Sequence, residues 1–212
     1  MKVLHLYRRA WAALERRFVG LLIRLRGHGY SFDILTHLTF SEKILLYRLA
    51  RSLRKDSVIV EVGSYLGASS VFLAIGAKGT GGVVYCVDTW ANDAMSEGSR
   101  DTYQEFLSNT KRVADYIRPL RGRSLEMAAQ FGESIDLLFV DGDHSYEAAS
   151  DDLRAWLPKL KDGGVVVCHD YGWKEGVKRA VEELISPVQL SPGRLVSGTY
   201  WARVRGTRRD PL

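Results

Sequence analysis

The sequence contains little cysteine, little proline and no long uninterrupted apolar run. Of its 212 residues, 2 are cysteine and 5 are proline, while 46% are hydrophobic and 26% are charged. This composition excludes a disulfide-rich secreted domain, a proline-rich or collagen-like chain and an intrinsically disordered chain. Cys86 and Cys168 lie in apolar, strand-like runs, so we expect buried free thiols and a reducing, cytoplasmic compartment. The length suits one domain with an appended segment.

The net charge of +5 is unevenly distributed along the chain. Residues 1–27 carry a net charge of +6 and the tail from Arg203 carries +3, so the body between them, residues 28–202, carries −4. A nucleic-acid-binding domain would gather cationic side chains around its site. The acidic body therefore argues against nucleic acid as the partner.

The N-terminal segment predicts an amphipathic helix. Apolar residues recur at alternating spacings of three and four, which places on one stripe Leu4, Tyr7, Trp11, Leu14, Phe18, Leu21 and Leu25. Charges interrupt the stretch, so it cannot span a bilayer, and we predict neither a secretory signal nor a serine-rich transit peptide. We favour packing of the stripe on its own domain or on the same helix of a second subunit, in a homo-oligomer. The alternative is peripheral contact with the anionic inner face of a membrane.

From Ser41 onward the chain alternates helical and strand-like segments. Ser41 is predicted to cap a helix over 41–53. Strand-like runs follow at 58–62, 82–88, 117–122, 135–141 and 163–170, with helical patterns at 67–77, 99–114, 124–131 and 146–160. Continuous Val, Ile and Leu indicate strands covered on both faces by helices. The sequence therefore predicts an α/β fold with a doubly wound, mostly parallel sheet and a terminal antiparallel hairpin around a Ser-Pro-Gly turn.

Polar and glycine residues follow the predicted strands where each strand ends. In open α/β sheets, ligands bind outside the carboxyl ends of the strands. The candidates at these ends are Glu61, Gly63, Asp88, Gly122, Ser124, Asp141, Asp143, His144, His169 and Asp170. Five strand ends are thus expected to converge on one mouth.

The glycine-rich turn after the first strand differs from a dinucleotide fingerprint. It carries Glu61 before Gly63 and Gly67, with Ser69 where a third glycine would stand. A carboxylate in such a turn would repel a pyrophosphate but attract a cationic amino-acid ligand. Asp88, after the second strand, is placed to bind both hydroxyls of a ribose. These features favour S-adenosylmethionine (SAM) over NAD.

At this point the sequence resembles a known family. Glu61-Val62-Gly63-Ser64-Tyr65-Leu66-Gly67 is similar to the first motif of class I SAM-dependent methyltransferases, and "CVDTW" to their second. The run from Asp136 to Tyr171 resembles the Rossmann-like methyltransferase family numbered 24, close to the macrolide-sugar O-methyltransferases and the cephalosporin hydroxylase-like proteins. The resemblance extends from about Ser41 to about Leu184. We predict a Rossmann-like methyltransferase domain at 31–204, between an amphipathic helical extension at 1–30 and a basic tail at 205–212, and the resemblance covers neither the extension nor the tail.

The resemblance also implies which residues bind the cofactor. Those expected to line the methionine end are Glu61, Gly63, Ser64 and Gly67. Asp88 would bind the ribose and Trp90 would flank the adenine. The segment that borders the adenine ring corresponds to Gly122, Arg123 and Ser124. Asp141 belongs to both the cofactor-binding set and the catalytic set.

Methyl transfer from a sulfonium to an alcohol requires a partly deprotonated hydroxyl in line with the methyl group. The resemblance implies that Asp141 and Asp170 hold a divalent ion, Mg²⁺ or Mn²⁺, and that His144 is the general base. The simpler alternative for His144 is a residue near a helix N-cap. His169 stands where related enzymes carry an oxygen ligand, which leaves three alternatives: it points away, it joins a softer ion such as Mn²⁺, or no metal binds.

The expected function is therefore SAM-dependent O-methylation of a small polar acceptor, such as a sugar hydroxyl of a glycan or a natural product. The polar loop "DTWANDAMSEGS" is predicted to form a lid over the mouth. Two alternatives remain open. One is an RNA methyltransferase, which the basic ends favour, and the other is a non-catalytic SAM-binding or membrane-associated scaffold.

Overall fold

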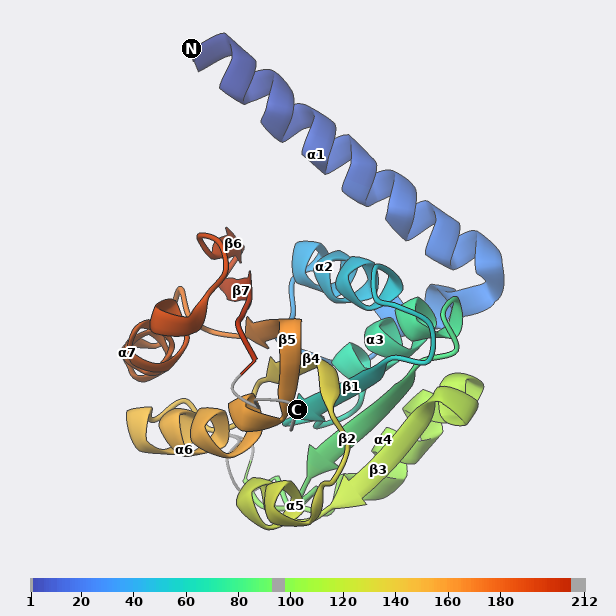
Figure 1. Cartoon of the computed structure of the whole chain (residues 1–212). Helices are drawn as coiled ribbons and strands as arrows, with labels where there is room; N and C mark the ends of the chain where they lie inside the picture. Colours follow the sequence, from blue (N-terminus) through green and yellow to red (C-terminus); the bar gives the residue numbers. More distant parts are fainter. Residues whose placement is uncertain (1, 93–97, 207–212) are drawn as a thin grey trace.

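The computed structural model describes residues 2–92 and 98–206 (Figure 1). The basic tail predicted at 205–212 thus lies outside the described residues, apart from Arg205 and Gly206. Residues 93–97 of the predicted lid loop also lie outside them. Side chains are described from Tyr7 onward, with Arg8 and Arg9 excepted, so the side chain of Leu4 is not considered further.

A seven-stranded sheet forms the centre of the molecule, in the order β3-β2-β1-β4-β5-β7-β6. The strands are β1 (Val58–Val62), β2 (Val83–Asp88), β3 (Ile117–Arg121), β4 (Ile135–Val140), β5 (Leu160–Cys168), β6 (Arg194–Val196) and β7 (Thr199–Arg203). β1 to β5 pair in parallel, β7 pairs antiparallel with β5, and β6 pairs antiparallel with β7. The chain winds outward from β1 in one direction and then resumes at β4 in the other. The carboxyl ends of β1 and β4 therefore form the switch point at which such sheets bind ligands.

Helices cover both faces of this sheet, as the continuous apolar strands require. The helices of the domain are α2 (Phe40–Arg51), α3 (Ala68–Lys78), α4 (Tyr103–Thr110), α5 (Ser124–Gln130), α6 (Tyr146–Trp156) and α7 (Glu175–Leu184). Short helical turns are η3 (Lys111–Tyr116), η4 (Leu157–Lys159) and η5 (Ser186–Val188). One buried cluster joins α2, α3 and α4 to the sheet, and a second joins α5, α6 and α7 to its other face. The predicted doubly wound α/β architecture is confirmed.

Three local predictions differ from the structure. The cap of α2 is Thr39, not Ser41: the Thr39 hydroxyl accepts from the Glu42 N–H, and the Glu42 carboxylate accepts from the Thr39 N–H at 2.8 Å. This reciprocal pair is a capping box, a pattern of Thr and Glu three residues apart. The Ser-Pro-Gly turn precedes β6, whereas the hairpin turns at Ser197 and Gly198. Finally, α7 was not predicted.

The N-terminal helix α1 (Lys2–Ile23) projects beyond the body, which it joins through η1 (Arg24–His28) and η2 (Gly29–Phe32) (Figure 1). Ile23 is 1% exposed, and a Cβ at Gly20 would lie 2.7 Å from the Phe40 ring, so these positions face α2. The predicted apolar stripe faces away from the domain, which corrects the expectation that it packs there. Among the described residues, we find no helix that is both long and apolar enough to cross a bilayer.

Candidate functional site

A cleft of about 520 Å³ opens at the carboxyl ends of the parallel strands. Its wall includes, of the residues predicted from the sequence, Gly63, Ser64, Asp88, Gly122, Arg123, Ser124, Asp141, Asp143, His144, His169 and Asp170. It also includes Asn92, from the loop predicted to form a lid, and residues that were not predicted to belong to the site: Leu35, Thr36, His37 and Asp152. The size is typical of a pocket for a small molecule or cofactor.

The turn after β1 depends on its glycines. Gly63 has φ 86°, and a Cβ there would lie 2.1 Å from the carbonyl oxygen of Asp141, so the ends of β1 and β4 can meet only at glycine. Gly67, with φ 85°, is the N-cap of α3, and a Cβ there would lie 2.7 Å from Thr110. Ser64 is buried in the turn beside Glu61, and its hydroxyl helps to lower the pKa of that carboxyl against the larger effect of burial, which raises it.

Asp88 holds the glycine turn in place. Its Oδ2 accepts hydrogen bonds from the N–H groups of Ser64 and Tyr65, both at 2.8 Å, and its Oδ1 accepts from the Trp90 N–H at 2.6 Å. Because each carboxylate oxygen can accept more than one hydrogen bond, lone pairs remain for a ligand hydroxyl in the cleft. The predicted ribose residue is thus also the residue that shapes the turn.

Three predicted cofactor residues do not lie on the cleft wall: Glu61, Gly67 and Trp90. Glu61 is fully buried beneath the turn, where its carboxylate accepts from the Ser70 hydroxyl of α3, and burial raises its pKa. Trp90 is also fully buried: its ring lies 4.8 Å from Tyr103 and 4.7 Å from Phe106, and its Nε1 donates to the Tyr65 carbonyl. Successive strand residues point to opposite faces, so the side chain of Glu61 packs against α3 while Val62 lines the cleft.

The wall on the β3 side contains an acid of α6 that was not predicted to belong to the site. Asp152 of α6 is 8% exposed and lines the cleft with Ser124. Burial raises the pKa of Asp152 to about 6, although a hydrogen bond with Ser124 opposes this shift. The Ser124 hydroxyl also accepts from the Trp156 Nε1 at 2.9 Å. A carboxyl group with a pKa near neutrality inside a cleft is typical of functional sites.

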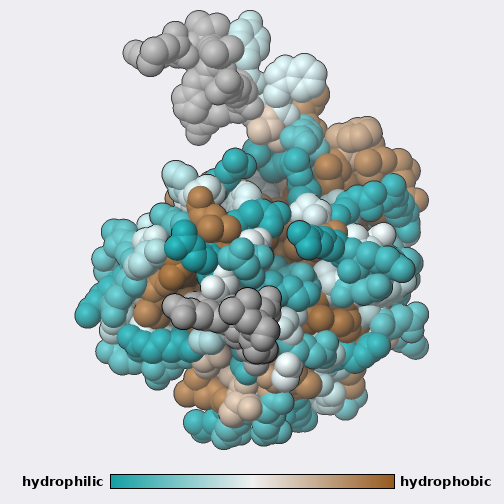
Figure 2. Space-filling view, viewed as in Figure 1, coloured by the Kyte–Doolittle hydropathy of each residue, from teal (hydrophilic) through white to brown (hydrophobic). Residues whose placement is uncertain are grey.

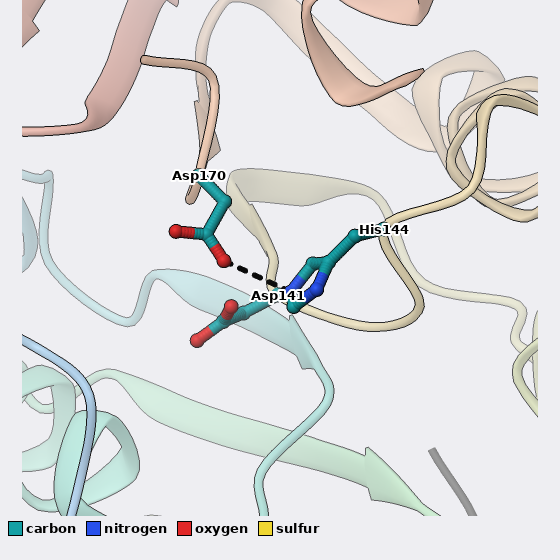
Figure 3. A group of neighbouring side chains, drawn as sticks. All are labelled: Asp141, His144 and Asp170. Atoms are coloured by element: carbon teal, nitrogen blue, oxygen red, sulfur yellow. Dashed lines mark ion pairs between the residues drawn. The ribbon is translucent and has the colours of Figure 1, made fainter. Parts of the chain in front are cut away.

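His144 and Asp170 face each other on the side of the cleft that lies away from β3 (Figure 3). The His144 Nε2 lies 2.9 Å from Asp170 Oδ2, and the His144 side chain is 40% exposed. The hydrogen bond with Asp170 raises the pKa of His144, while burial opposes the rise. The same bond, together with His169, lowers the pKa of Asp170. An imidazole oriented by a carboxylate is the arrangement that general bases require.

His169 lies behind these residues, between three carboxylates. Its Nδ1 lies 3.0 Å from Asp141 Oδ1 and 3.5 Å from Asp170 Oδ2, and its Nε2 lies 3.7 Å from Glu42 Oε1. Burial opposes a charge on this ring, but the carboxylates outweigh it and raise the pKa of His169 to about 12. His169 is therefore a buried cation at neutral pH. Burial raises the pKa of Asp141, and the His169 ring partly opposes that rise.

Glu42 connects this cluster to two distant parts of the chain. Besides forming the α2 capping box, its Oε1 accepts from the Gly198 N–H at 3.1 Å and from the Thr199 hydroxyl at 2.8 Å. Burial opposes ionisation of Glu42, but the nearby His169 ring and hydrogen bonds from Thr39 and Thr199 lower its pKa to about 2. Sequence reasoning missed this role, although the capping box could have identified Glu42 as a structural residue.

A divalent ion fits only part of the predicted ligand set. Asp141, His144 and Asp170 each offer one ligand atom, and these atoms lie within 4.8 Å of one another. The three side chains point toward one another (Figure 3). Two carboxylates and an imidazole suit Mn²⁺ better than Mg²⁺. His169 is not part of this group, and its nitrogens face the carboxylates of Asp141, Asp170 and Glu42. Its role as a metal ligand stays a prediction.

Three residues of the cleft wall, Tyr65, Asn92 and Asp170, have an unusual backbone. Tyr65 in the glycine turn has φ 46°, and Asp170 after β5 has φ 57°. Left-handed conformations in residues other than glycine are uncommon and cluster at functional sites. Tyr65 and Asp170 lie at the strand ends where the cleft opens.

The comparisons with known proteins agree with this fold and cleft. Residues 60–171, about half of the chain, match the family model described as "Methyltransferase domain" and numbered 24. The chain therefore belongs to this methyltransferase family. It is 31% identical to the uncharacterized protein y4gI of Sinorhizobium fredii over 116 residues, which cover 53% of this chain but only 13% of that relative. An uncharacterized protein of Acanthamoeba polyphaga mimivirus is 25% identical over 150 residues, covering 68% of this chain and 67% of that protein.

Solved structures share the architecture. Cofactor-bound Rv0187 from MTB is similar with a TM-score of 0.66 and 19% identity, covering 89% of this chain and 90% of that one. The O-methyltransferase from Bacillus cereus in complex with SAH gives a TM-score of 0.62 at 16% identity, covering 92% and 90%. SAH-bound PaMTH1 from Podospora anserina gives 0.64 at 14%, covering 82% and 81%. These likenesses establish the Rossmann-like methyltransferase fold.

Proposed function

We propose that the protein transfers the methyl group of SAM to a hydroxyl of a small polar acceptor, such as a sugar of a glycan or of a natural product. The observation that carries the proposal is the pair His144 and Asp170, 2.9 Å apart, on the wall of the cleft that the glycine turn also lines. A base oriented for proton removal, beside a turn suited to a small cofactor, is what O-methyl transfer requires.

The cofactor would occupy the half of the cleft between the glycine turn and the β3 end. The glycine turn, with the remaining lone pairs of Asp88, would meet the methionine and ribose groups, and Asp152 would lie near the adenine. SAM carries a sulfonium and an ammonium, and the cleft wall is correspondingly acidic. Against Arg123 and the His169 ring, its acidic residues are Asp88, Glu126, Asp141, Asp143, Asp152 and Asp170. Glu61 acts in this proposal through the turn that it supports.

His144 would accept the proton of the acceptor hydroxyl as the oxygen attacks the methyl group. The reaction forms an oxygen–carbon bond, breaks the carbon–sulfur bond and leaves neutral S-adenosylhomocysteine, with the proton on His144. Asp170 holds the imidazole in place and stabilises its charged form. Only the neutral imidazole can act as base, so the raised pKa of His144 predicts that turnover rises with pH above its ordinary range near 6.5.

Metal assistance is a finer part of the proposal. Asp141 and Asp170 would hold a divalent ion, and when bound that ion would lower the pKa of an acceptor hydroxyl. His144 cannot serve as a ligand and as the base through one nitrogen at the same time. Turnover after EDTA treatment, with Mn²⁺ and Mg²⁺ added back separately, distinguishes the two roles. A requirement for Mn²⁺ over Mg²⁺ would identify His144 as a ligand, and metal-independent turnover would leave it as the base.

The first experiment is isothermal titration of the purified protein with SAM and with NAD. We expect SAM to bind and NAD to give no heat; the reverse result would contradict the proposed cofactor. Transfer of a labelled methyl group is then measured to a panel of glycosides and phenols, with total tRNA and rRNA included. Methylation of RNA alone would show that the acidic cleft does not exclude RNA as the acceptor. SAM binding without transfer to any acceptor would favour a non-catalytic protein.

A further inference from the structure

Six large apolar side chains of α1 and the adjoining η1 face solvent: Tyr7, Trp11, Leu14, Phe18 and Leu21 on α1, and Leu25 on η1. Trp11 is 71% exposed and Phe18 is 59% exposed. They form the apolar stripe of the helix, and the hydrophobic residues over α1 are visible at the upper right of Figure 2. A continuous exposed apolar face of this kind normally marks a surface that another partner covers.

The contacts between α1 and the body keep this stripe exposed. Glu15 Oε1 lies 2.9 Å from Arg48 of α2, and the close approach at Gly20 and the burial of Ile23 fix the rotation of the helix. Residues of an α-helix are about 100° apart around its axis, which places Gly20 and Ile23 on the side opposite Phe18. The stripe cannot turn toward α2 without breaking these contacts.

The charges beside the stripe discriminate between two kinds of partner. Arg17, Arg24 and Arg26 are exposed next to it, and Glu15 is the one acid in residues 1–27. Glu15 already pairs with Arg48. Two copies joined along the stripe would bring arginines together without a free carboxylate from either helix, whereas paired helices usually place opposite charges at these flanks. An anionic surface supplies the charge that the helix lacks.

We propose that the outward face of α1 docks on the anionic lipid surface of a membrane, lying in the plane of the interface. The aromatic and leucine side chains would enter the boundary between headgroups and acyl chains, and the arginines would extend to lipid phosphates. The occupant is thus a lipid surface and not a second copy of the chain. This inference does not depend on the methyltransferase activity.

The test is flotation of the full-length protein with vesicles. Vesicles of phosphatidylcholine alone are compared with vesicles in which about one third of the lipid is phosphatidylglycerol. We expect partitioning about tenfold stronger on the anionic vesicles, because each arginine near the surface contributes attraction to anionic lipid. About 0.5 M salt should remove most of this difference by screening.

Two pairs of variants separate the apolar and ionic contributions. Trp11→Ser with Phe18→Ser should abolish binding, whereas Leu190→Ser with Leu195→Ser removes two exposed apolar side chains elsewhere and should not change it. Arg17→Gln with Arg26→Gln should weaken binding about tenfold. Lys55→Gln with Lys111→Gln removes the same charge from other exposed positions and should have little effect. All four replaced side chains of α1 and η1 are exposed, so unchanged thermal unfolding would exclude a folding defect.

Sedimentation velocity without lipid tests whether two copies of the chain associate through the stripe instead. The proposal would be overturned if the wild type forms dimers and does not float with vesicles, and if Trp11→Ser with Phe18→Ser dissociates those dimers. A second copy of the chain would then cover the stripe. Equal binding to both vesicle types would also overturn it, since the anionic surface would then play no part. SAM titration on the same samples keeps the outcome separate from that of the proposed function.

Discussion

The two halves of the cleft use their acidic residues in different ways. On the β1 and β2 side, Glu61 and Asp88 bond to the hydroxyl and backbone N–H groups of the glycine turn and of the residues near it. On the β4 and β5 side, Asp141 and Asp170 face imidazoles. The first half is a cradle shaped by neutral donors, and the second is an ionic cluster. The comparison shows that an acid at a strand end can build a site or take part in its chemistry, and that its partners decide which.

Alanine at Gly63 should disrupt the cradle more than any other single change. The new Cβ would lie 2.1 Å from the Asp141 carbonyl oxygen, in a backbone with φ 86°. Overpacking and backbone strain together would cost about 5 kcal/mol of unfolding free energy. Urea unfolding and SAM titration measure the loss. Gly132→Ala is the matched control, because a Cβ there has no described atom within 4 Å. Equal destabilisation by the two changes would contradict the close approach.

Glutamine at His144 tests whether the ionic cluster performs chemistry. Removing a general base should lower turnover about a thousandfold. The affinity for SAM should stay unchanged, because His144 lies on the acceptor side of the proposed site. His37→Gln removes another imidazole from the cleft wall and should lower turnover much less. The proposed role fails if both variants lose the same activity, or if His144→Gln loses SAM affinity instead.

Glutamine at Glu42 tests whether the buried cluster stabilises the fold. Glu42 has a folded-state pKa of about 2, below its ordinary 4.5, so its ionic contribution is complete above pH 4.5 and is lost as the pH falls toward 2. We expect the variant to be less stable by about 2 kcal/mol at pH 7, with a deficit that shrinks as the pH falls below 4.5. Urea unfolding between pH 3 and 7 provides the measurement. Glu147→Gln, at an exposed position of α6, should show no such deficit.

Asparagine at Asp152 tests the cradle side with the smallest expected effect. The folded-state pKa of Asp152 is about 6, above its ordinary 3.8. Its contribution to stability is therefore complete below pH 3.8 and is lost as the pH rises through 6. Between pH 4.5 and pH 7 the free energy of unfolding of the variant should fall by about 1.5 kcal/mol less than that of the wild type, which urea unfolding at the two pH values would measure. An unchanged pH dependence would mean that Asp152 ionises freely in the folded protein.

The regular elements were predictable because their signals are local. The continuous apolar runs identified β1 to β5, and the spacing of apolar residues identified α1, α3, α5 and α6. α7 was missed although its side chains alternate clearly between apolar and charged faces. The cap at Thr39 was missed because Ser41 is also a good capping residue, and only the position of Glu42 distinguishes them.

The sequence predicted most residues of the site but not the directions in which their side chains point. The order of the strands brings Gly63, Asp88, Asp141 and Asp170 to one cleft, since carboxyl ends of parallel strands share an edge. Glu61 and Trp90 turned inward, because a strand or turn residue can point to either side of the sheet. Glu42 was not foreseen, because its partner His169 lies far along the chain.

The sequence by itself determined the family, the α/β fold and the set of strand-end residues, because periodicity and glycine turns are encoded over a few neighbouring positions. Tertiary structure decided that His169 is a buried cation, that Asp152 lines the cleft and that the apolar stripe of α1 faces outward. Those properties depend on burial and on contacts between distant segments, such as Glu42 with His169 and Glu15 with Arg48. Burial and distant charges act through space, and the linear sequence does not record which groups will become neighbours.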